Sequence, residues 1–365
     1  MQTRTGEIET PVFMPVGTQA TVKTLHPQEV EETGAQIILC NTYHLMLRPG
    51  ADVLEDAGGL HRFMGWGGPI LTDSGGFQIF SLAQQARVRE EGVTFRSHID
   101  GSPHTLTPES AVNLQARFGS EIMMPLDHLV GLPATPGKIA DAAARTERWL
   151  NRSIVAHRES EVSTKGVLFG IAQGGMNREL RKQQAQMVAQ SDVAGSAIGG
   201  LSVGEPKEVM ASMIEEICPL LPASRPRYLM GVGSPEDLWD GVALGIDMFD
   251  CVLPTRLARN GALFTLDGRV DILKAQYRDL HEAIDPSCDC ATCAKFTAAY
   301  LHHLFRAREV LGLRLATVHN LRYLARQMEV MRAAIVDNQF EAAHRAFDGR
   351  YRPVVRASRM SPPVA

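Results

Sequence analysis

The sequence predicts an α/β protein whose core is a (β/α)8 barrel. Eight short apolar runs recur along the chain, and helix-like stretches separate them. Continuous apolar runs are typical of parallel strands that helices cover on both faces. Eight strand–helix units within about 240 residues match such a barrel, and a doubly wound open sheet is the alternative. The runs are residues 12–17, 37–41, 69–73, 122–127, 167–173, 196–201, 227–233 and 245–250.

Helix signals lie between these runs. Thr107 is a predicted N-cap, Pro108 suits the first helical position, and Glu109 is an acid in the first turn. Two longer stretches, residues 138–157 and 205–217, also have helical periodicity. Helices at these places would cover the predicted strands.

Polar and glycine residues at the carboxyl ends of the runs predict one shared pocket. In a barrel these ends converge on one mouth, where active sites lie. A single aspartate after a strand is often a helix cap, but capping does not explain such endings on successive strands. We therefore predict a polar pocket that contains no metal. The ends are Asn41, Asp73, Asp127, Gln173, Gly200, Met230 and Asp250.

The chemistry of these ends points to a purine and a glycosidic bond. Of two carboxylates in a closed site, one can attack the anomeric carbon while the other moves protons. An aspartate with a glutamine and backbone N–H groups suits the edge of a purine, because the carboxylate accepts from N1–H and the exocyclic amine. Phe77 and Met230 could hold a flat ring between them, although methionine more often fills a gap in a core.

A cysteine cluster in the last quarter of the chain predicts a zinc site. Three thiolates and one imidazole form a closed tetrahedral zinc site, which holds structure and does not catalyse. Three free thiols are one alternative, and an iron–sulfur cluster, which usually needs four cysteines, is another. His302 and His303 are alternatives for the imidazole. The predicted ligands are Cys288, Cys290, Cys293 and His319, the last of which lies in an apolar-periodic helix.

Composition places the chain among ordinary enzymes. It has 365 residues, of which 44% are hydrophobic and 21% charged. No run approaches the roughly 18 apolar residues of a membrane span, no signal peptide precedes the first domain, and reduced cysteines favour the cytoplasm. The net charge of −4 does not predict a nucleic-acid partner, but residues 301–360 hold eleven arginines against five acids. This surplus suits phosphate contacts, and a solvated helical face is the simpler alternative.

Long motifs make the chain resemble the tRNA-guanine transglycosylases from Thr10 to about Pro353. They include ETPVFMPVGTQATVK, NTYHLMLRPG, LTDSGGFQIFSL, FGIAQGG, YLMGVGSPEDL and GIDMFDCVLPTRLARNG. The resemblance implies exchange of the wobble guanine of GUN-anticodon tRNAs for 7-aminomethyl-7-deazaguanine, a step toward queuosine, usually by a homodimer. It implies a barrel over residues 1–270, a zinc-binding subdomain with closing helices over 271–353, and a tail over 354–365.

The resemblance also assigns roles to residues at matching positions. Asp250 falls on the nucleophile, which holds the tRNA as a covalent ester, and Asp73 on the general acid/base. Base contacts fall on the side chains of Phe77, Asp127 and Gln173 and on the backbone of Gly200 and Leu201. Arg256 and Arg259 match positions near the anticodon phosphates, and the cysteine cluster with His319 matches the zinc ligands.

Two departures from the family pattern bear on the ends of the barrel and on the substrate. The chain starts at MQTRTGEIETP, later than typical relatives, so one end of the barrel could be open. Leu129 is aliphatic, as in eukaryotic members that accept queuine, whereas Val203 is the bacterial type. We expect 7-aminomethyl-7-deazaguanine, with queuine as the alternative base. A non-catalytic tRNA-binding partner subunit is a further alternative, although such a subunit needs neither Asp73 nor Asp250.

Overall fold

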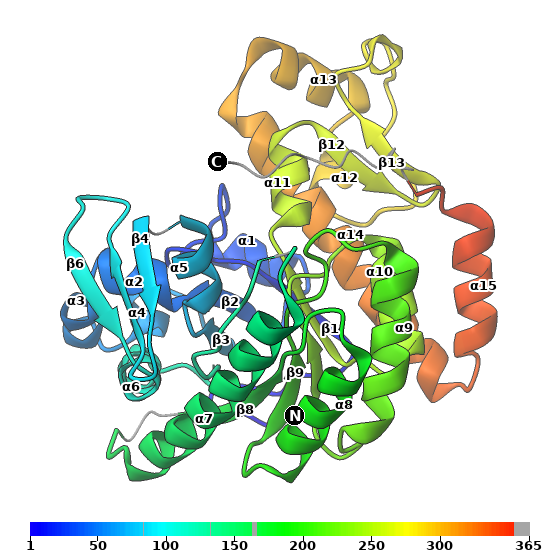
Figure 1. The fold of residues 1–365 in the computed structure, drawn as a ribbon. Helices are drawn as coiled ribbons and strands as arrows, with labels where there is room; N and C mark the ends of the chain where they lie inside the picture. Colours follow the sequence, from blue (N-terminus) through cyan, green and yellow to red (C-terminus); the bar gives the residue numbers. More distant parts are fainter. Residues whose placement is uncertain (83, 132, 163–165, 354–365) are drawn as a thin grey trace. The chain divides into compact units, whose positions relative to one another are not determined.

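The predicted eight-stranded parallel barrel is present (Figure 1). The computed structural model describes residues 1–82, 84–131, 133–162 and 166–353, so the expected tail over 354–365 lies outside the described residues. Each of the eight apolar runs contributes one strand. The strands are β1 (Val12–Pro15), β2 (Ile38–Asn41), β3 (Ile70–Asp73), β7 (Ile122–Met123), β8 (Val167–Ala172), β9 (Gly195–Ile198), β10 (Arg227–Leu229) and β11 (Met248–Cys251).

Closure of the sheet distinguishes the barrel from a doubly wound sheet. The strand order is β1-β11-β10-β9-β8-β7-β3-β2, and every neighbouring pair is parallel. A parallel bridge between Val16 and Leu39 joins the two ends of this order. The N–H of Gly17 donates to the carbonyl of Leu39 at 2.6 Å beside this bridge. The open-sheet alternative is therefore wrong.

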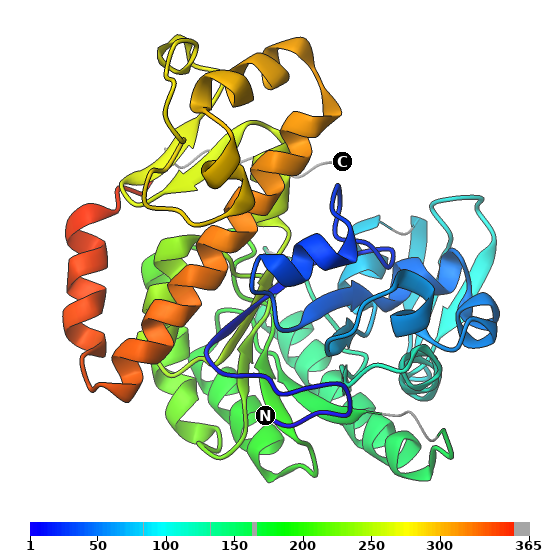
Figure 2. The ribbon, with the colours of Figure 1, turned by 180° about the vertical axis from the view of Figure 1, so that it is seen from behind.

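The N-terminal segment covers the end of the barrel where the strands begin (Figure 2). The terminal amino group of Met1 donates to the carbonyl of Ile8 at 2.6 Å, and Ile8 is fully buried with the core residues of the barrel. Arg4 pairs with Glu121 at 2.7 Å, and Glu121 accepts from the N–H of Ile70 at the start of β3. This end of the barrel is therefore covered by residues 1–8.

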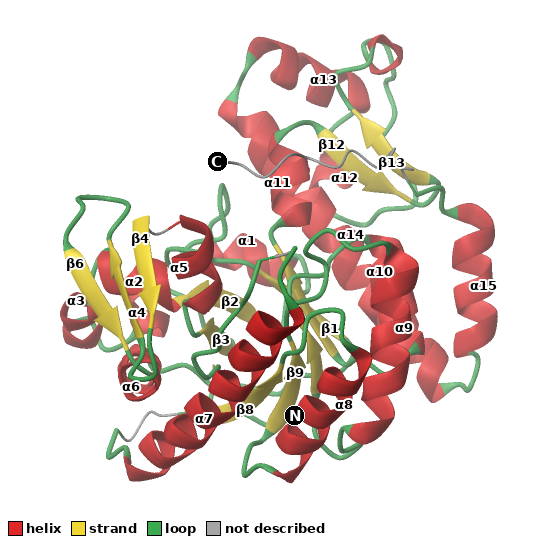
Figure 3. Ribbon diagram, in the orientation of Figure 1, coloured by secondary structure: helices red, strands yellow, loops and turns green. Residues whose placement is uncertain are grey.

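Helices lie outside the strands of the barrel unit (Figure 3). The predicted N-cap is confirmed, because the side chain of Thr107 accepts from the N–H of Ser110 at 3.2 Å at the start of α6. The two longer helical stretches are confirmed as α7 and α9. The helices of this unit are α1 (Pro27–Glu32), α2 (Thr42–Leu47), α3 (Ala51–Asp56), α4 (Leu60–Met64), α5 (Gly76–Leu82), α6 (Pro108–Phe118), α7 (Pro136–Glu159), α8 (Arg178–Gln190), α9 (Lys207–Ile217) and α10 (Pro235–Ala243), with a 3₁₀ turn at Cys218–Leu220.

A small antiparallel sheet between α5 and α6 was not anticipated from the sequence. It consists of β4 (Gln84–Val88), β5 (Val93–Arg96) and β6 (Pro103–Leu106). Its turn is anchored to α7, since Arg148 donates to both carboxylate oxygens of Glu90 at 2.6 and 2.8 Å. The indole N–H of Trp149 also donates to the carbonyl of Glu90 at 2.8 Å. This sheet is therefore held to the barrel by charged and neutral hydrogen bonds.

The chain divides into two compact units between Leu253 and Pro254. We expected this boundary at residue 270, but residues 254–270 lie in the second unit. The buried side chain of Asn320 links them to it, donating to the carbonyls of Pro254 and Ala262 at 3.0 Å and accepting from the N–H of Phe264 at 3.0 Å.

The second unit combines one hairpin with a long helix. Across the described residues, no helix combines the length and apolarity that crossing a membrane requires. The elements are α11 (Leu253–Arg259), which begins at the boundary, β12 (Ala262–Thr265), β13 (Gly268–Asp271), a 3₁₀ turn at Ala275–Tyr277, α12 (Ala291–Lys295), α13 (Ala298–Ala307), α14 (Val310–Val336) and α15 (Phe340–Arg350).

Candidate active site and metal centre

Asp73 is the last residue of β3 and is held by the end of the neighbouring strand. The parallel register places Asn41 of β2 opposite Asp73. The amide nitrogen of Asn41 donates to Oδ2 of Asp73 at 2.5 Å, and the N–H of Thr42 donates to Oδ1 at 2.9 Å. Both carboxylate oxygens therefore have donors from one strand end. Asn41 was expected at the mouth, and the structure gives it this specific partner.

The surroundings of Asp73 favour proton exchange near neutral pH. Burial raises the pKa of Asp73 to about 6, the hydrogen bonds from Asn41, Thr42 and Gln78 oppose this, and the charge of Asp250 raises it further. A carboxyl group with such a pKa can both give and take a proton at physiological pH.

Asp250 lies within β11, and its donors bind a single oxygen. Oδ1 accepts from the hydroxyl of Tyr228 at 2.6 Å and from the N–H of Gly231 at 2.8 Å. Burial raises the pKa of Asp250, whereas these two hydrogen bonds lower it. Tyr228 is 1% exposed. Tyr228 is not among the residues predicted from the sequence, although its hydroxyl is the only one in the apolar run 227–233 and was the available signal.

Asp127 and Gln173 form a second hydrogen-bonded pair at the ends of neighbouring strands. Gln173 directly follows β8, and its amide nitrogen donates to Oδ2 of Asp127 at 2.6 Å. Burial raises the pKa of Asp127, and the hydrogen bonds from Gln173 and Ser74 lower it. β7 is only two residues long, so Asp127 lies beyond the strand end, after Pro125, which cannot donate to a sheet.

The loop after β9 lies against Gln173 and has a glycine in a left-handed backbone conformation. Gly200 has a φ of +66°, and a Cβ there would lie 2.5 Å from Oε1 of Gln173. Its neighbour Leu201 is buried. The structure thus brings together Asp127, Gln173 and the backbone of Gly200, as the sequence predicts.

The two predicted ring contacts differ in their environments. Phe77, on α5, is 54% exposed, which leaves its ring accessible to a flat partner. Met230 is partly buried and packs against the core of the barrel, and its N–H donates to the carbonyl of Ile198 at 3.2 Å. This packing is in keeping with the more common role of methionine, and the contact of Met230 with a flat ring stays a prediction.

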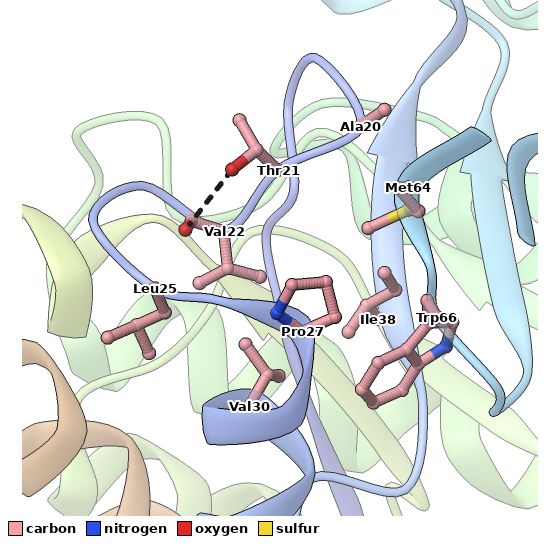
Figure 4. A pocket seen from close by; sticks show the side chains of 9 residues that line it. All are labelled: Ala20, Thr21, Val22, Leu25, Pro27, Val30, Ile38, Met64 and Trp66. Atoms are coloured by element: carbon pink, nitrogen blue, oxygen red, sulfur yellow. Dashed lines mark hydrogen bonds between the residues drawn. The ribbon is translucent and has the colours of Figure 1, made fainter.

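A separate cavity in the barrel unit is apolar (Figure 4). None of its lining side chains titrates, and the hydroxyl of Thr21 already donates to the carbonyl of Val22. Acid–base chemistry therefore belongs to the strand ends and not to this cavity. Its lining residues are Ala20, Thr21, Val22, Leu25, Pro27, Val30, Ile38, Met64 and Trp66.

Cys288, Cys290, Cys293 and His319 come together in the second unit. Their ligand atoms all lie within 4.8 Å of one another. Nδ1 of His319 lies 3.2 Å from Sγ of Cys293 and 3.5 Å from Sγ of Cys290. These spacings are close to the roughly 3.3–3.8 Å that separates the ligand atoms of a tetrahedral ion. The four side chains could hold a metal ion, as the sequence predicts.

The other nitrogen of the imidazole decides between the candidate histidines. Nε2 of His319 lies 2.6 Å from the carbonyl of Phe264, so the ring donates there and turns Nδ1 toward the sulfurs. His302 instead uses Nδ1 in a 2.7 Å hydrogen bond with the carbonyl of Ile272. His319 is therefore the fourth member of the group.

Arg256 and Arg259 lie on one face of α11 without acidic partners. Arg256 is exposed, and Arg259 donates to the carbonyl of Thr255 at 2.9 Å. Burial lowers the pKa of Arg259, and the charge of Arg256 lowers it further. Neither forms an ion pair within the described ranges. An anion placed beside both would relieve their mutual repulsion.

Part of the arginine surplus over residues 301–360 is used within the second unit. Arg322 pairs with Asp289 and Glu329, each at 2.6 Å, and Arg350 pairs with Asp267 at 2.7 Å. These ion pairs give some of the arginines a structural role that needs no phosphate partner. The predicted phosphate-binding surface therefore depends on the remaining arginines.

Comparison with known proteins identifies relatives over almost the whole chain. The family model described as queuine tRNA-ribosyltransferase matches residues 1–353. The chain is 57% identical over 354 residues to the queuine tRNA-ribosyltransferase of Herpetosiphon aurantiacus, covering 97% of this chain and 89% of that protein. It is 54% identical over 346 residues to the protein of that name from Moorella thermoacetica, covering 95% and 92%. For the protein of that name from Dictyoglomus turgidum the identity is 51% over 360 residues, covering 99% and 92%.

Proposed function

Because the chain belongs to the queuine tRNA-ribosyltransferase family and is thus a tRNA-guanine transglycosylase, we propose that it replaces the wobble guanine of GUN-anticodon tRNAs with 7-aminomethyl-7-deazaguanine. The tRNAs are those for Asp, Asn, His and Tyr, and the product leads to queuosine. The observation that carries the proposal is that two carboxylates of the barrel strands, Asp73 of β3 and Asp250 of β11, are each held by hydrogen bonds from a neighbouring strand or the loop after it. Two such groups serve substitution at a glycosidic carbon.

In the proposed first step Asp250 is the nucleophile. Because its donors bind Oδ1, the second oxygen is available to attack C1′ of the wobble nucleotide. The C1′–N9 bond breaks, guanine leaves with the electron pair, and Asp73 supplies a proton to it. The tRNA is then held as an ester of Asp250.

The second step reverses the first with a different base. The Asp73 carboxylate takes the proton from N9 of the incoming base, and N9 attacks C1′ while the bond to Asp250 breaks. Two inversions retain the anomeric configuration. A pKa of about 6 lets Asp73 act as acid and then as base. One glycosidic bond replaces another, so the exchange is nearly balanced in free energy.

Base recognition is assigned to the second polar pair. The carboxylate of Asp127 would accept from N1–H and the exocyclic amine, while Gln173 and the backbone of Gly200 and Leu201 meet the rest of the purine edge. Gln173 already donates to Asp127, so binding exchanges one hydrogen bond for another. The exposed ring of Phe77 would stack on the base.

The choice of incoming base depends on a cavity beside this pair. Leu129, Val130 and Val203 line it together with Gln173 and Gly200. We propose 7-aminomethyl-7-deazaguanine, with queuine as the second candidate because Leu129 resembles members that accept it. Direct competition of the two bases for insertion into tRNA decides between them. Pocket changes on the scale of one methylene alter such a preference by about 1–3 kcal/mol.

The tRNA must present an unstacked wobble base to this pocket, because the reacting carbon is inaccessible inside a stacked loop. We propose that Arg256 and Arg259, which lack acidic partners across the described chain, contact the anticodon phosphates. We also propose a homodimer, which light scattering would test, and a cytoplasmic location, where tRNA is available.

We propose that the metal group binds one zinc ion per chain. Three thiolates and an imidazole are the donors of structural zinc sites, and four protein ligands leave no open position for catalysis. Bound zinc would cross-link α12 to α14 and so stabilise the second unit. The proposed role is structural and not catalytic.

The decisive experiment measures incorporation of radiolabelled guanine into an unmodified GUN-anticodon tRNA. Wild type should incorporate label and Asp250→Asn should not. Asp247→Asn is a matched control, because Asp247 accepts from the N–H of Arg227 at the opposite end of the strand. Equal incorporation by Asp250→Asn and wild type would disprove the assignment of Asp250 as the nucleophile. No incorporation by folded, metal-loaded wild type would favour a non-catalytic tRNA-binding subunit.

A further inference from the structure

Arg181 is a fully buried arginine on α8, with 0% of its surface exposed. It makes no ion pair with any acidic residue in the part of the chain that the structure describes. Burying a charge without a partner is unfavourable, and so is a cation near the N-terminus of a helix. Burial lowers the pKa of Arg181 to about 10, and the charge of Glu205 opposes this, so the side chain stays cationic at neutral pH. The hydrogen bonds of its guanidinium must therefore offset the cost of burying the charge.

The guanidinium of Arg181 binds three backbone carbonyls on two loops. Nε donates to the carbonyl of Gly175 at 2.6 Å, in the loop after β8. Nη1 and Nη2 donate to the carbonyl of Gly199 at 3.1 Å, and Nη2 also donates to that of Gly200 at 3.0 Å, in the loop after β9. The contact is close, since a Cβ on Gly174 would lie 2.9 Å from Cγ of Arg181.

These two loops carry the groups proposed to read the base. Gln173 begins the first loop, and Gly200 and Leu201 belong to the second. In a trans peptide the C=O and N–H point in opposite directions. The cis peptides of the described chain lie elsewhere, at Thr10–Pro11 and Arg48–Pro49. Fixing the carbonyls of Gly199 and Gly200 on Arg181 therefore directs the N–H groups of Gly200 and Leu201 away from it.

We infer that Arg181 is a positioning residue for recognition of the purine's carbonyl oxygen. It holds the Gly199 and Gly200 carbonyls so that the following N–H groups donate to that oxygen. A cation at the carbonyl end also polarises each peptide and strengthens its N–H as a donor. The inference rests on the proposed function, because it needs a guanine-type base between these loops.

This role makes a specific prediction about base preference. Guanine carries an oxygen at position 6, whereas 2,6-diaminopurine carries an amine there, which donates and so opposes an N–H donor. Loss of Arg181 should therefore weaken the binding of guanine more than the binding of 2,6-diaminopurine. If Arg181 only stabilised the fold, its replacement would weaken the binding of both bases equally.

The test compares wild type with Arg181→Lys and Arg181→Met. Lys182→Met is the matched control, because Lys182 is the next residue on α8, is half-buried and pairs with Glu179 and Glu216 instead of the two loops. Inhibition constants of guanine and 2,6-diaminopurine are measured in the exchange assay, together with kcat, KM for guanine and the unfolding midpoint. We expect the preference for guanine to fall at least about tenfold in Arg181→Met, as for loss of one buried hydrogen bond. The Lys182→Met control should keep the wild-type preference for guanine. In the Arg181 variants, kcat at saturating base should change less than KM for guanine.

Each outcome separates this inference from the proposed function. If wild type incorporates no guanine, the proposed function fails. If wild type is active and a folded Arg181 variant keeps the wild-type preference, the inference on Arg181 is overturned while the function stands. If Arg181→Met does not fold, Arg181→Lys decides. It keeps the charge, but one ammonium group cannot span carbonyls on both loops, so its preference should still fall.

Discussion

The hydroxyl of Tyr228 donates to Oδ1 of Asp250 across adjacent strands at 2.6 Å. Tyr228 lies on β10 opposite Met248 of β11, two residues before Asp250. The N–H of Gly231 donates to the same oxygen at 2.8 Å. Together they orient the carboxylate, and neither of them binds Oδ2.

Replacing Tyr228 by phenylalanine should slow exchange by about 10–100-fold, because a donor to the reacting carboxylate is lost. That loss should raise the pKa of Asp250 further, so the deficit should be largest at low pH. The measurement is the pH profile of guanine incorporation. Tyr43→Phe is the control, since Tyr43 is also buried but its hydroxyl bonds to His98 at 2.8 Å. Identical profiles for Tyr228→Phe and wild type would contradict this role.

Guanine incorporation should fall as the pH drops through about 6. In this range Asp73, whose pKa burial raises to about 6, becomes protonated and can no longer accept a proton from the incoming base. The incoming base meets the covalent form, in which esterified Asp250 carries no charge, so the midpoint should lie somewhat below the pKa of Asp73 in the free enzyme. A pH–rate profile of kcat/KM for guanine tests this. A flat profile between pH 5 and pH 8 would exclude Asp73 as the base.

Asp73→Asn should stabilise the protein at pH 8 but not at pH 4. Because the folded-state pKa of Asp73 is raised above the usual value of 3.8, the stability linked to its proton is present below about pH 4. It is lost as the pH rises through 6, whereas asparagine never ionises. We expect a gain of about 1–2 kcal/mol at pH 8. Urea unfolding at both pH values measures it, and an equal difference at both would argue against a raised pKa.

His319→Ala should lose the bound metal and destabilise the second unit. Structural zinc contributes its binding free energy directly to folding. Elemental analysis should find one zinc ion per chain in wild type and less than a tenth of that in the variant. Limited proteolysis should cut the variant first within the second unit, which begins at Pro254. His303→Ala is the control, because His303 is exposed and lies outside the cysteine group. Full zinc content in His319→Ala would refute the ligand assignment.

Arg256→Ala and Arg259→Ala should weaken tRNA binding without changing the affinity for the free base. If each arginine neutralises one phosphate, each substitution should lower the slope of log K against log salt by about 0.7–0.9. Binding of a GUN-anticodon stem-loop at several salt concentrations measures this slope. Arg345→Ala is the control, because Arg345 already pairs with Glu341 on α15. An unchanged slope in both variants would remove α11 from the tRNA surface.

Local features of this protein followed from the sequence. The eight strands coincide with eight apolar runs, and Thr107 caps α6 as predicted, because strand burial and helix capping depend on neighbouring residues. Grouping of Asp127 with Gln173 followed from one rule, that parallel strands of a barrel end at the same mouth. The metal group followed from the preference of zinc for thiolate and imidazole donors.

The sequence by itself determined which segments form strands, which residues end them and which side chains can bind a metal. Only the tertiary structure decided that Val16 meets Leu39 to close the barrel, that Tyr228 holds Asp250, and that Arg181 joins two loops. It also decided that residues after Pro254 join the second unit. These contacts join residues that are far apart in the sequence. Local periodicity carries no information about which distant groups meet, so no spacing along the chain specifies them.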